Sequence, residues 1–373
     1  MLRKDMTIAL YTVIVSPHQL PLAREIAALV GTDNYRYIFT EPFHKERRAM
    51  GWLDDSEPWI VSEKEEPALA RKWLNDCDIL ICGPRDLDLM ESRAKRGKLT
   101  FYANERWFKP IGLCHARLQI PGWVRMWHPG YRRMARRFVA MVKKYDSIKL
   151  LPFGVWARRD FLSIGVPEEK MTTWAYFVES SKVREFESSK VDPQNPEPSN
   201  FQTFKPSNPQ TLKLLWVGRM LGWKRVDTIV SALREICRDG SRPVSLTLVG
   251  DGPERERLVG LAKELPVEFL KSVPIAEVRN LMRSHDAYVL SSNGQEGWGA
   301  ALNEALEEKM LCIGTFEAGS SATILPDSNL YHAGDSHALA HLLRKASAGE
   351  LPRPGIGDWS VKMAAIKFLE MCK

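Results

Sequence analysis

The chain has 373 residues, 44% of them hydrophobic, and it carries 53 Lys and Arg against 46 Asp and Glu. This length predicts two globular domains, and the apolar content excludes a disordered or collagen-like chain. No uncharged apolar run in the sequence approaches the roughly 20 residues that a membrane-spanning helix needs. The six cysteines form no CxxC pair, which excludes a zinc ribbon or disulfide scaffold and indicates reduced core thiols.

The first predicted strand is the apolar run Ile8–Val15, which a turn separates from a helix over Leu22–Val30. Two basic residues before the run imitate a secretory signal, but Ser16-Pro17-His18-Gln19 is not a small-residue cleavage site. We therefore expect a cytoplasmic protein. His18 follows the strand and is a candidate ligand contact in the predicted cleft; the alternative is a solvated loop histidine.

Basic residues are concentrated between Arg93 and Arg159, where 17 basic side chains face only two acidic ones. Such a density indicates an anionic partner. Within this region, Phe101–Lys109 follows a probable strand and mixes charged with aromatic side chains. We expect Glu105 and Arg106 to line a ligand pocket at the carboxyl edge of the sheet, and a structural ion pair is the alternative.

An amphipathic helix is predicted over Tyr131–Tyr145, with apolar residues at helical spacing and six Lys and Arg on the rest of its surface. The aromatic segment Pro121–Trp127 precedes it. This pattern predicts that residues 121–145 contact an anionic membrane surface; the alternative is a core helix with a basic solvent face. No nucleic-acid motif accompanies the basic residues, so we expect no nucleic-acid partner.

Strands alternate with helices throughout the chain, which predicts an α/β fold of two doubly wound, parallel-sheet domains facing a central cleft. Residues 1–180 form the first domain and 211–358 the second. Residues 187–210 hold five Pro, four Ser and three Asn, as expected for a linker or exposed loop. The further strands expected are 79–82, 212–217, 246–249, 287–290 and 312–315.

Two motifs in the second half predict a nucleotide site. Gly218 and Arg219 end one strand, and Lys224 precedes the next helix, so two cations lie near unpaired helix amides. Two solvated basic residues in an ordinary loop are the alternative. The turn Gly250-Asp251-Gly252-Pro253 follows another strand, where Gly250 and Gly252 leave room for a base or ribose, unless it is a plain Gly-Pro turn.

The most specific motif is the loop Ser291–Gly299, which follows the strand 287–290 and opens a helix over 300–309. Glu296 lies in the loop and Glu304 eight residues later, so the two carboxylates can contact different parts of an extended ligand. On its own, such a pair also occurs on any solvated helix face. The amides of the loop are candidate donors to hydroxyls or phosphate oxygens; they belong to Gly297, Trp298 and Gly299.

The order G-R-x4-K, V-G-D-G-P and S-S-x3-E-G-W-G-x4-E resembles the C-terminal domain of the family 4 retaining glycosyltransferases, which have the GT-B fold. The resemblance covers about Leu212–Leu343 and implies that Arg219 and Lys224 hold the donor diphosphate. It also implies that Glu296 contacts hydroxyls of the transferred sugar and Glu304 the nucleotide ribose. Catalysis would then rest on Glu296, Arg219 and Lys224.

The resemblance is weaker in the first domain, where Val15–Gln19 lacks the Gly-Gly pair of many relatives. In this fold the first domain binds the acceptor, which makes His18, Glu105 and Arg106 the candidate acceptor contacts. The C-terminal helix, here within 359–373, returns in this fold to pack on the first domain. The expected function is metal-independent, retaining sugar transfer from a nucleoside-diphosphate sugar to a glycan or lipid-linked acceptor in surface polysaccharide or lipopolysaccharide synthesis. No cofactor is expected, and membrane association would be peripheral, on the cytoplasmic face.

Two other functions remain open, namely a sugar-nucleotide epimerase of the same fold and a non-enzymatic membrane or polyanion binder. A competing signal is Asp86-Leu87-Asp88, which imitates the D-x-D metal motif of the other large glycosyltransferase fold. The alternative for this motif is a helix start, because acidic residues are favoured in a first helical turn.

Overall fold

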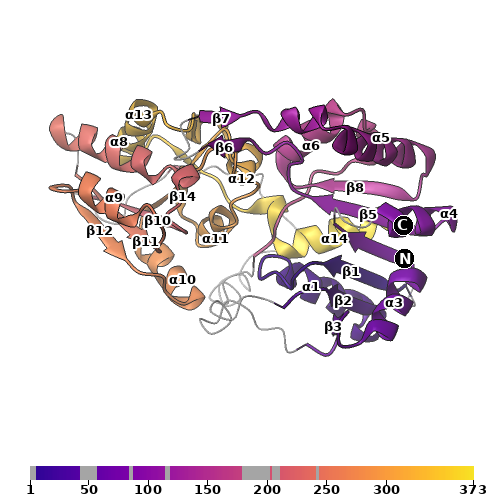
Figure 1. Ribbon diagram of the computed structural model, residues 1–373. Coiled ribbons are helices and arrows are strands. Elements are labelled where there is room, and N and C mark those ends of the chain that lie inside the picture. Colours follow the sequence, from indigo (N-terminus) through magenta and orange to yellow (C-terminus); the bar gives the residue numbers. More distant parts are fainter. Residues whose placement is uncertain are drawn as a thin grey trace. The chain divides into compact units, whose positions relative to one another are not determined.

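The computed structural model describes residues 6–42, 57–83, 87–113, 118–178, 202–203, 211–240 and 243–373. The chain forms two compact units (Figure 1). The first comprises Met1–Pro110, Ile120–Val178 and Asp358–Lys373, and the second comprises Ile111–Gln119 and Glu179–Gly357. Cys114 and most of the expected linker over 187–210 lie outside the described residues.

The first unit is built on a six-stranded parallel sheet in the order β3-β2-β1-β4-β5-β8. Helices follow β1, β3, β4, β5 and β8, as the crossovers between parallel strands require. The strands are β1 (Ile8–Thr12), β2 (Tyr35–Phe39), β3 (Ile60–Ser62), β4 (Ile79–Cys82), β5 (Leu99–Asn104) and β8 (Ile148–Pro152). The helices are α1 (Leu20–Val30), α3 (Pro67–Asp76), α4 (Leu87–Lys95), α5 (Pro129–Lys144), α6 (Gly154–Ser163) and α14 (Val361–Met371).

The C-terminal helix α14 belongs to this first unit, where it packs beside α1. Its Phe368 ring lies 5.2 Å from Phe101 of β5 and 6.3 Å from Trp174. The end of the chain thus completes the core of the unit that contains its beginning.

The second unit repeats the same strand order, β12-β11-β10-β13-β14-β15, again with every pair parallel. The strands are β10 (Leu212–Val217), β11 (Val244–Val249), β12 (Val267–Leu270), β13 (Ala287–Leu290), β14 (Leu311–Thr315) and β15 (Leu330–Tyr331). The helices are α8 (Val226–Arg238), α9 (Arg255–Leu261), α10 (Ile275–Ser284), α11 (Ala301–Glu307), α12 (Gly319–Ile324) and α13 (Ser336–Ala348). Helices α8 and α13 pack together over one core of buried aliphatic side chains from β10, β11 and β13.

Two short ladders complete the described structure. One joins β6 (Ile111–Leu113) to β7 (Leu118–Ile120), and the other joins β9 (Gln202–Thr203) to β16 (Pro352–Arg353). Together with the two large sheets, these elements confirm the predicted α/β fold of two doubly wound parallel sheets.

Helix α5 corrects one part of the sequence interpretation. Its apolar face does not lie free for a bilayer, since Ala135, Phe138, Met141 and Val142 are buried in the core of the first unit. The centre of the Phe138 ring lies 4.8 Å from that of Tyr102 and 4.9 Å from that of Trp107. An apolar helix face with this spacing can pack either on a protein core or on a membrane, and here it packs on the core of the first unit. Among the described residues, no helix is both long and apolar enough to cross a membrane.

Candidate functional site

The strand order of the second sheet reverses between β10 and β13. The chain adds β11 and β12 on one side of β10, and it then adds β13, β14 and β15 on the other side. In open α/β sheets, ligands bind beyond the carboxyl ends of the strands at such a switch point. Gly218 and Arg219 follow β10, and the loop Ser291–Gly299 follows β13. The topology therefore brings the two motifs to one edge of one sheet.

The glycines of this edge join two loops by close backbone contact. A Cβ at Gly250 would lie 1.9 Å from the carbonyl oxygen of Gly218, and one at Gly252 would lie 2.5 Å from that of Met220. The Met220 amide donates to Asp251, and its carbonyl accepts from the Glu254 amide. The predicted role was room for a ligand; the structure shows that these glycines also hold the β10 and β11 loops together.

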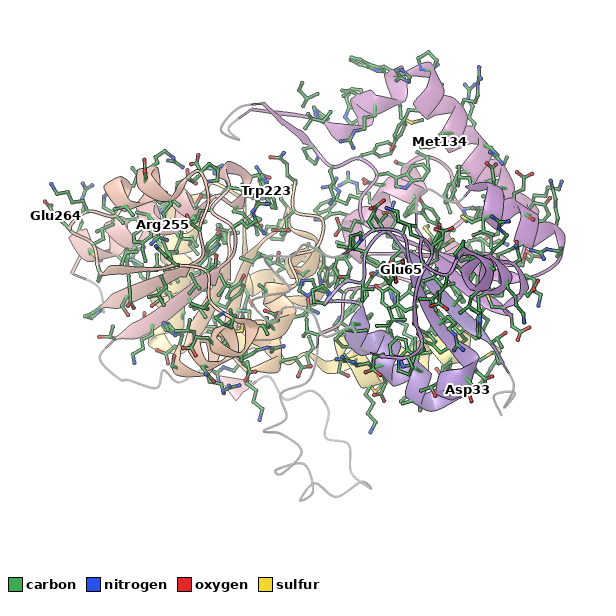
Figure 2. The ribbon with its side chains drawn as sticks, turned by 60° about the horizontal axis from the view of Figure 1, so that its bottom comes forward. Asp33, Glu65, Met134, Trp223, Arg255 and Glu264 are labelled. Atoms are coloured by element: carbon green, nitrogen blue, oxygen red, sulfur yellow. The ribbon has the colours of Figure 1, made fainter. Side chains whose placement is uncertain are left out.

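Lys224 and Glu296 contact each other at this edge, although they lie 72 residues apart in sequence. The Lys224 ammonium, at the end of the 3-10 turn Gly222–Lys224, donates to Oε2 of Glu296. It also lies 4.5 Å from the ring centre of Trp223, whose position Figure 2 labels. The Ser292 hydroxyl donates to the same oxygen at 2.9 Å. The sequence predicted both charged residues for the site but gave no signal for this ion pair.

The loop that carries Glu296 is fixed at both ends. The Ser291 hydroxyl donates to the carbonyl of Lys224 at 2.7 Å, and the Asn293 amide donates to that of Trp223 at 2.9 Å. At the other end, the buried Trp298 indole donates to the Asn303 side chain at 2.8 Å. Trp298 thus anchors the loop through its side chain, while Gly297 and Gly299 flank it. A carboxylate held by such packing needs little reorganisation when a ligand binds.

Glu304 lies in the first turn of α11 and is only 5% exposed. Burial raises the pKa of its carboxyl group; nearby Arg279 opposes this shift, and Glu308 adds to it. Arg279 donates to the backbone carbonyl of Glu304 at 3.0 Å. Among the described residues, no hydrogen bond reaches the Glu304 carboxylate. A buried carboxylate that accepts no hydrogen bond from these residues is suited to accept one from a hydroxyl group of a ligand.

Arg219 differs from its neighbours because it is exposed, and within the described chain it has no ion pair. Its guanidinium is therefore available to an anion. Arg219, Lys224, Glu296 and Glu304 all come from the loops and helix starts at the β10–β13 edge.

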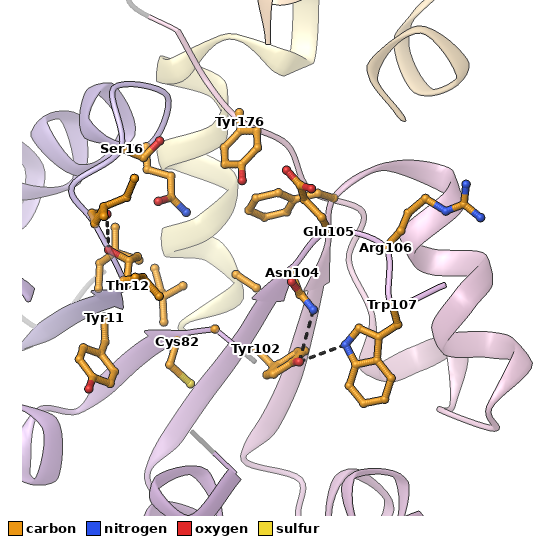
Figure 3. A pocket seen from close by; sticks show the side chains of 18 of the residues that line it. Tyr11, Thr12, Ser16, Cys82, Tyr102, Asn104, Glu105, Arg106, Trp107 and Tyr176 are labelled. Carbon is orange, nitrogen blue, oxygen red and sulfur yellow. Dashed lines mark hydrogen bonds between the residues drawn. The ribbon is translucent and has the colours of Figure 1, made fainter. Parts of the chain in front are cut away.

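The first unit contains a cavity of about 890 Å³ at the carboxyl ends of β1, β4 and β5 (Figure 3). Its lining includes polar groups such as Asn104, Glu105 and Glu41. Aromatic rings make up much of the remaining wall; they belong to Tyr11, Tyr102, Trp107, Tyr131, Phe153 and Tyr176. Rings beside carboxylates and amides suit a sugar, which has apolar ring faces and hydroxyl edges.

The three acceptor candidates from the sequence behave differently. Glu105 lines the cavity, is paired with Lys109 and forms a hydrogen bond with Tyr176. Arg106 also belongs to the lining, but its guanidinium turns away from Glu105 toward Asp160, at 3.6 Å (Figure 3). His18 is not a lining residue, although its ring lies 6.0 Å from that of Tyr176.

Arg106 therefore fits the structural alternative better than ligand contact. It is largely buried together with Asp160, and it lies 5.6 Å over the Trp156 ring. Burial raises the pKa of Asp160, which Arg106 and a hydrogen bond from the Phe108 amide counteract. The pair braces the segment that carries Glu105.

Sequence reasoning missed Tyr11, Glu41 and Tyr176 as cavity residues and assigned Tyr131 to the bilayer. Tyr11 and Tyr176 come from opposite ends of the first unit's chain, so no local spacing links them. Tyr11 could have been found as an aromatic residue near the carboxyl end of a strand. Tyr176 lies close to Trp174, which forms a bridge with Phe153 just after another strand.

Asp88, half of the imitated metal motif, lies in the first turn of α4 and accepts a hydrogen bond from Arg137 at 2.6 Å. Asp86 lies outside the described residues. Asp88 thus follows the helix-start alternative.

Comparison with known proteins follows the same division of the chain. A family model described as "Glycosyl transferases group 1" matches residues 199–354. An uncharacterised glycosyltransferase of Methanocaldococcus jannaschii is 30% identical over 104 residues, which are 27% of this chain. The match spans only about a quarter, 26%, of that relative's length.

Several solved structures share the complete fold. HepE of Anabaena, in complex with UDP and glucose, has a TM-score of 0.60 at 14% identity, with 98% of this chain and 99% of that chain covered. The lipopolysaccharide outer core galactosyltransferase WaaB has a TM-score of 0.63 at 17% identity, with coverage of 98% and 99%. A glycosyltransferase of Rickettsia africae has 0.60 at 16%, with 99% and 98% covered. Residues 199–354 of this chain therefore match the model of the group 1 glycosyl transferases, within a chain that has the GT-B fold.

Proposed function

We propose that the protein is a retaining glycosyltransferase that moves a sugar from a nucleoside-diphosphate sugar to a glycan or lipid-linked acceptor. The observation that supports this most directly is the contact between Lys224 and Glu296 at the β10–β13 switch point, where Arg219 follows β10 and Glu304 lies in the first turn of α11. Two cations suit a diphosphate, and two carboxylates suit the hydroxyls of a sugar and a ribose. Two solved relatives support the proposal: HepE is in complex with UDP and glucose, and WaaB is a lipopolysaccharide outer core galactosyltransferase.

In the proposed reaction, the bond from the sugar C1 to the diphosphate oxygen breaks, and C1 bonds to an acceptor hydroxyl on the same face. The acceptor proton passes to an oxygen of the departing phosphate. Negative charge grows on the diphosphate during this step, so Arg219 and Lys224 stabilise the transition state more than the ground state. Their charge supplies what a divalent cation would otherwise supply, and we propose metal-independent transfer with no cofactor.

Nucleotide binding is the first measurement. We expect calorimetric titration with UDP, GDP and ADP, in the absence of metal, to detect one of them. Arg219→Ala should weaken that binding about tenfold or more, because a charge-assisted phosphate contact is lost. Arg238→Ala removes another exposed arginine, at the far end of α8, and should leave nucleotide binding unchanged. Equal affinity of Arg219→Ala and the unmodified protein would contradict the diphosphate assignment.

The alternatives give different results in the same system. An epimerase would change the sugar nucleotide with no acceptor present, and a non-enzymatic binder would bind none of the three nucleotides. Strict dependence on Mg²⁺ would contradict metal-independent transfer.

We further propose that the protein works in the cytoplasm and contacts an anionic membrane surface through residues 121–145. The five described cysteines are all free, as in a reducing compartment. Trp123 and Trp127 are 52% and 70% exposed and pack edge to face. Arg132, Arg133 and Arg136 are exposed on α5. In this form of the contact, basic side chains and two indoles meet the headgroups, while the apolar face of α5 stays in the core.

Vesicle sedimentation tests this contact. We expect the triple variant Arg132→Gln, Arg133→Gln, Arg136→Gln to bind vesicles containing anionic lipid at least tenfold more weakly, since each basic residue contributes about 1 kcal/mol. A control removes the same charge elsewhere on the first unit, at exposed Arg71, Lys72 and Lys362. Equal loss in both variants would show attraction by net charge alone, and no loss in either would contradict membrane contact.

A further inference from the structure

The ion pair between Lys224 and Glu296 joins the two residues to which the proposed function gives different ligand groups. Lys224 is assigned to the diphosphate and Glu296 to the sugar. In the structure, however, the ammonium of one donates to the carboxylate of the other. A diphosphate and Glu296 are both anions, so they are rivals for the same cation.

The pair is well placed to compete. Its side chains are only 17% and 11% exposed, so the attraction is screened less than on the surface. Ser292 donates to the same Glu296 oxygen, and the Trp223 ring lies beside the ammonium. The carboxylate is thus held in position whether or not Lys224 remains bonded to it.

What Glu296 receives in exchange depends on the ligand. An intact donor brings sugar hydroxyls that can donate to the carboxylate once Lys224 turns to the diphosphate. A nucleoside diphosphate without its sugar binds the Lys224 ammonium but brings no sugar hydroxyl to Glu296. The largely buried carboxylate is then left without its counter-ion.

Resting on the proposed function, we propose that the Lys224–Glu296 pair makes the site discriminate the intact donor from the nucleoside-diphosphate product. When the sugar leaves with the acceptor, Glu296 loses its hydroxyl partners and recaptures Lys224, which weakens the hold on the diphosphate. Arg219 has no such rival among the described residues and attracts both ligands alike.

A double-mutant cycle on nucleoside-diphosphate binding tests the competition. The proteins are the unmodified chain, Glu296→Gln, Lys224→Met and the double variant, each titrated with the diphosphate that binds. We expect Glu296→Gln to bind it about three- to tenfold more tightly, because Lys224 is released. In the Lys224→Met background the same change should alter affinity less than about twofold.

Two outcomes would overturn the inference. Unchanged or weaker binding by Glu296→Gln would mean that Lys224 bridges carboxylate and diphosphate without competition. An equal gain in both backgrounds would mean that Glu296 acts through general negative charge. A second measurement compares the affinity for the intact donor with the affinity for the nucleoside diphosphate. We expect the preference for the intact donor to be smaller in Glu296→Gln than in the unmodified protein.

The proposed function fails separately, through Arg219. If neither the unmodified protein nor any variant binds a nucleoside diphosphate, or if Arg219→Ala binds it normally, the diphosphate site itself is wrong. If Arg219→Ala weakens binding and Glu296→Gln fails to strengthen it, the site is right and the competition is wrong.

Discussion

Glu296→Gln is expected to lower sugar transfer by about a hundred- to a thousandfold, even though it should bind the nucleoside diphosphate at least as well as the unmodified protein. Glutamine keeps the shape of the side chain but removes its negative charge and replaces one acceptor oxygen by a donor. Sugar hydroxyls and the positive charge that develops at C1 both lose a partner in the transition state. The measurement is kcat with saturating donor, beside calorimetry with the diphosphate.

A matched control for this variant is Glu256→Gln, which changes an exposed carboxylate in the first turn of α9 and should leave kcat unaltered. Retention of more than about a tenth of kcat by Glu296→Gln would contradict the catalytic assignment. Glu296 would then serve mainly to hold Lys224. The calorimetry separates a catalytic loss from a misfolded site, because only a folded site binds the diphosphate.

Much of the fold is predictable because buried parallel strands have a simple local signature. The apolar runs 79–82, 212–217 and 287–290 match β4, β10 and β13 residue for residue. Each run ends at a glycine or small polar residue, so the sequence also locates the carboxyl edges where ligands bind. The first run was predicted too long, since Ile8–Val15 continues past β1, which ends at Thr12.

The contacts between distant segments are what the sequence cannot supply. The Lys224–Glu296 pair and the Arg106–Asp160 pair each join residues more than 50 positions apart, and neither has a spacing that marks it. The spacing of apolar residues predicts that α5 is amphipathic, but it does not predict what covers the apolar face of the helix. That answer depends on Tyr102, which the order of strands brings beneath Phe138.

Gly250→Ala is the substitution for which we expect the largest loss of stability. Gly250 has φ of +131°, a conformation that residues with a Cβ rarely adopt. Its added Cβ would also meet the carbonyl oxygen of Gly218 at 1.9 Å. Because that oxygen belongs to backbone rather than to a flexible side chain, the β10 and β11 loops would have to separate.

We expect Gly250→Ala to destabilise the second unit by about 3 kcal/mol or more, which lowers Tm by roughly 6–12 °C. Gly260→Ala is the matched control, since Gly260 lies exposed in α9 and nothing within 4 Å would meet its Cβ. There alanine should be neutral or stabilise by up to about 1 kcal/mol. Thermal unfolding of both variants measures the difference.

Nucleotide binding should fall together with this loss of stability, because Gly218 immediately precedes Arg219. A shift of the β10 loop displaces Arg219, which we propose binds the diphosphate, without altering its charge. We therefore expect Gly250→Ala to bind the diphosphate about tenfold or more weakly at temperatures where it is still folded. A variant that melts like the unmodified protein and binds normally would contradict the backbone contact between the two loops, and with it their role in positioning Arg219.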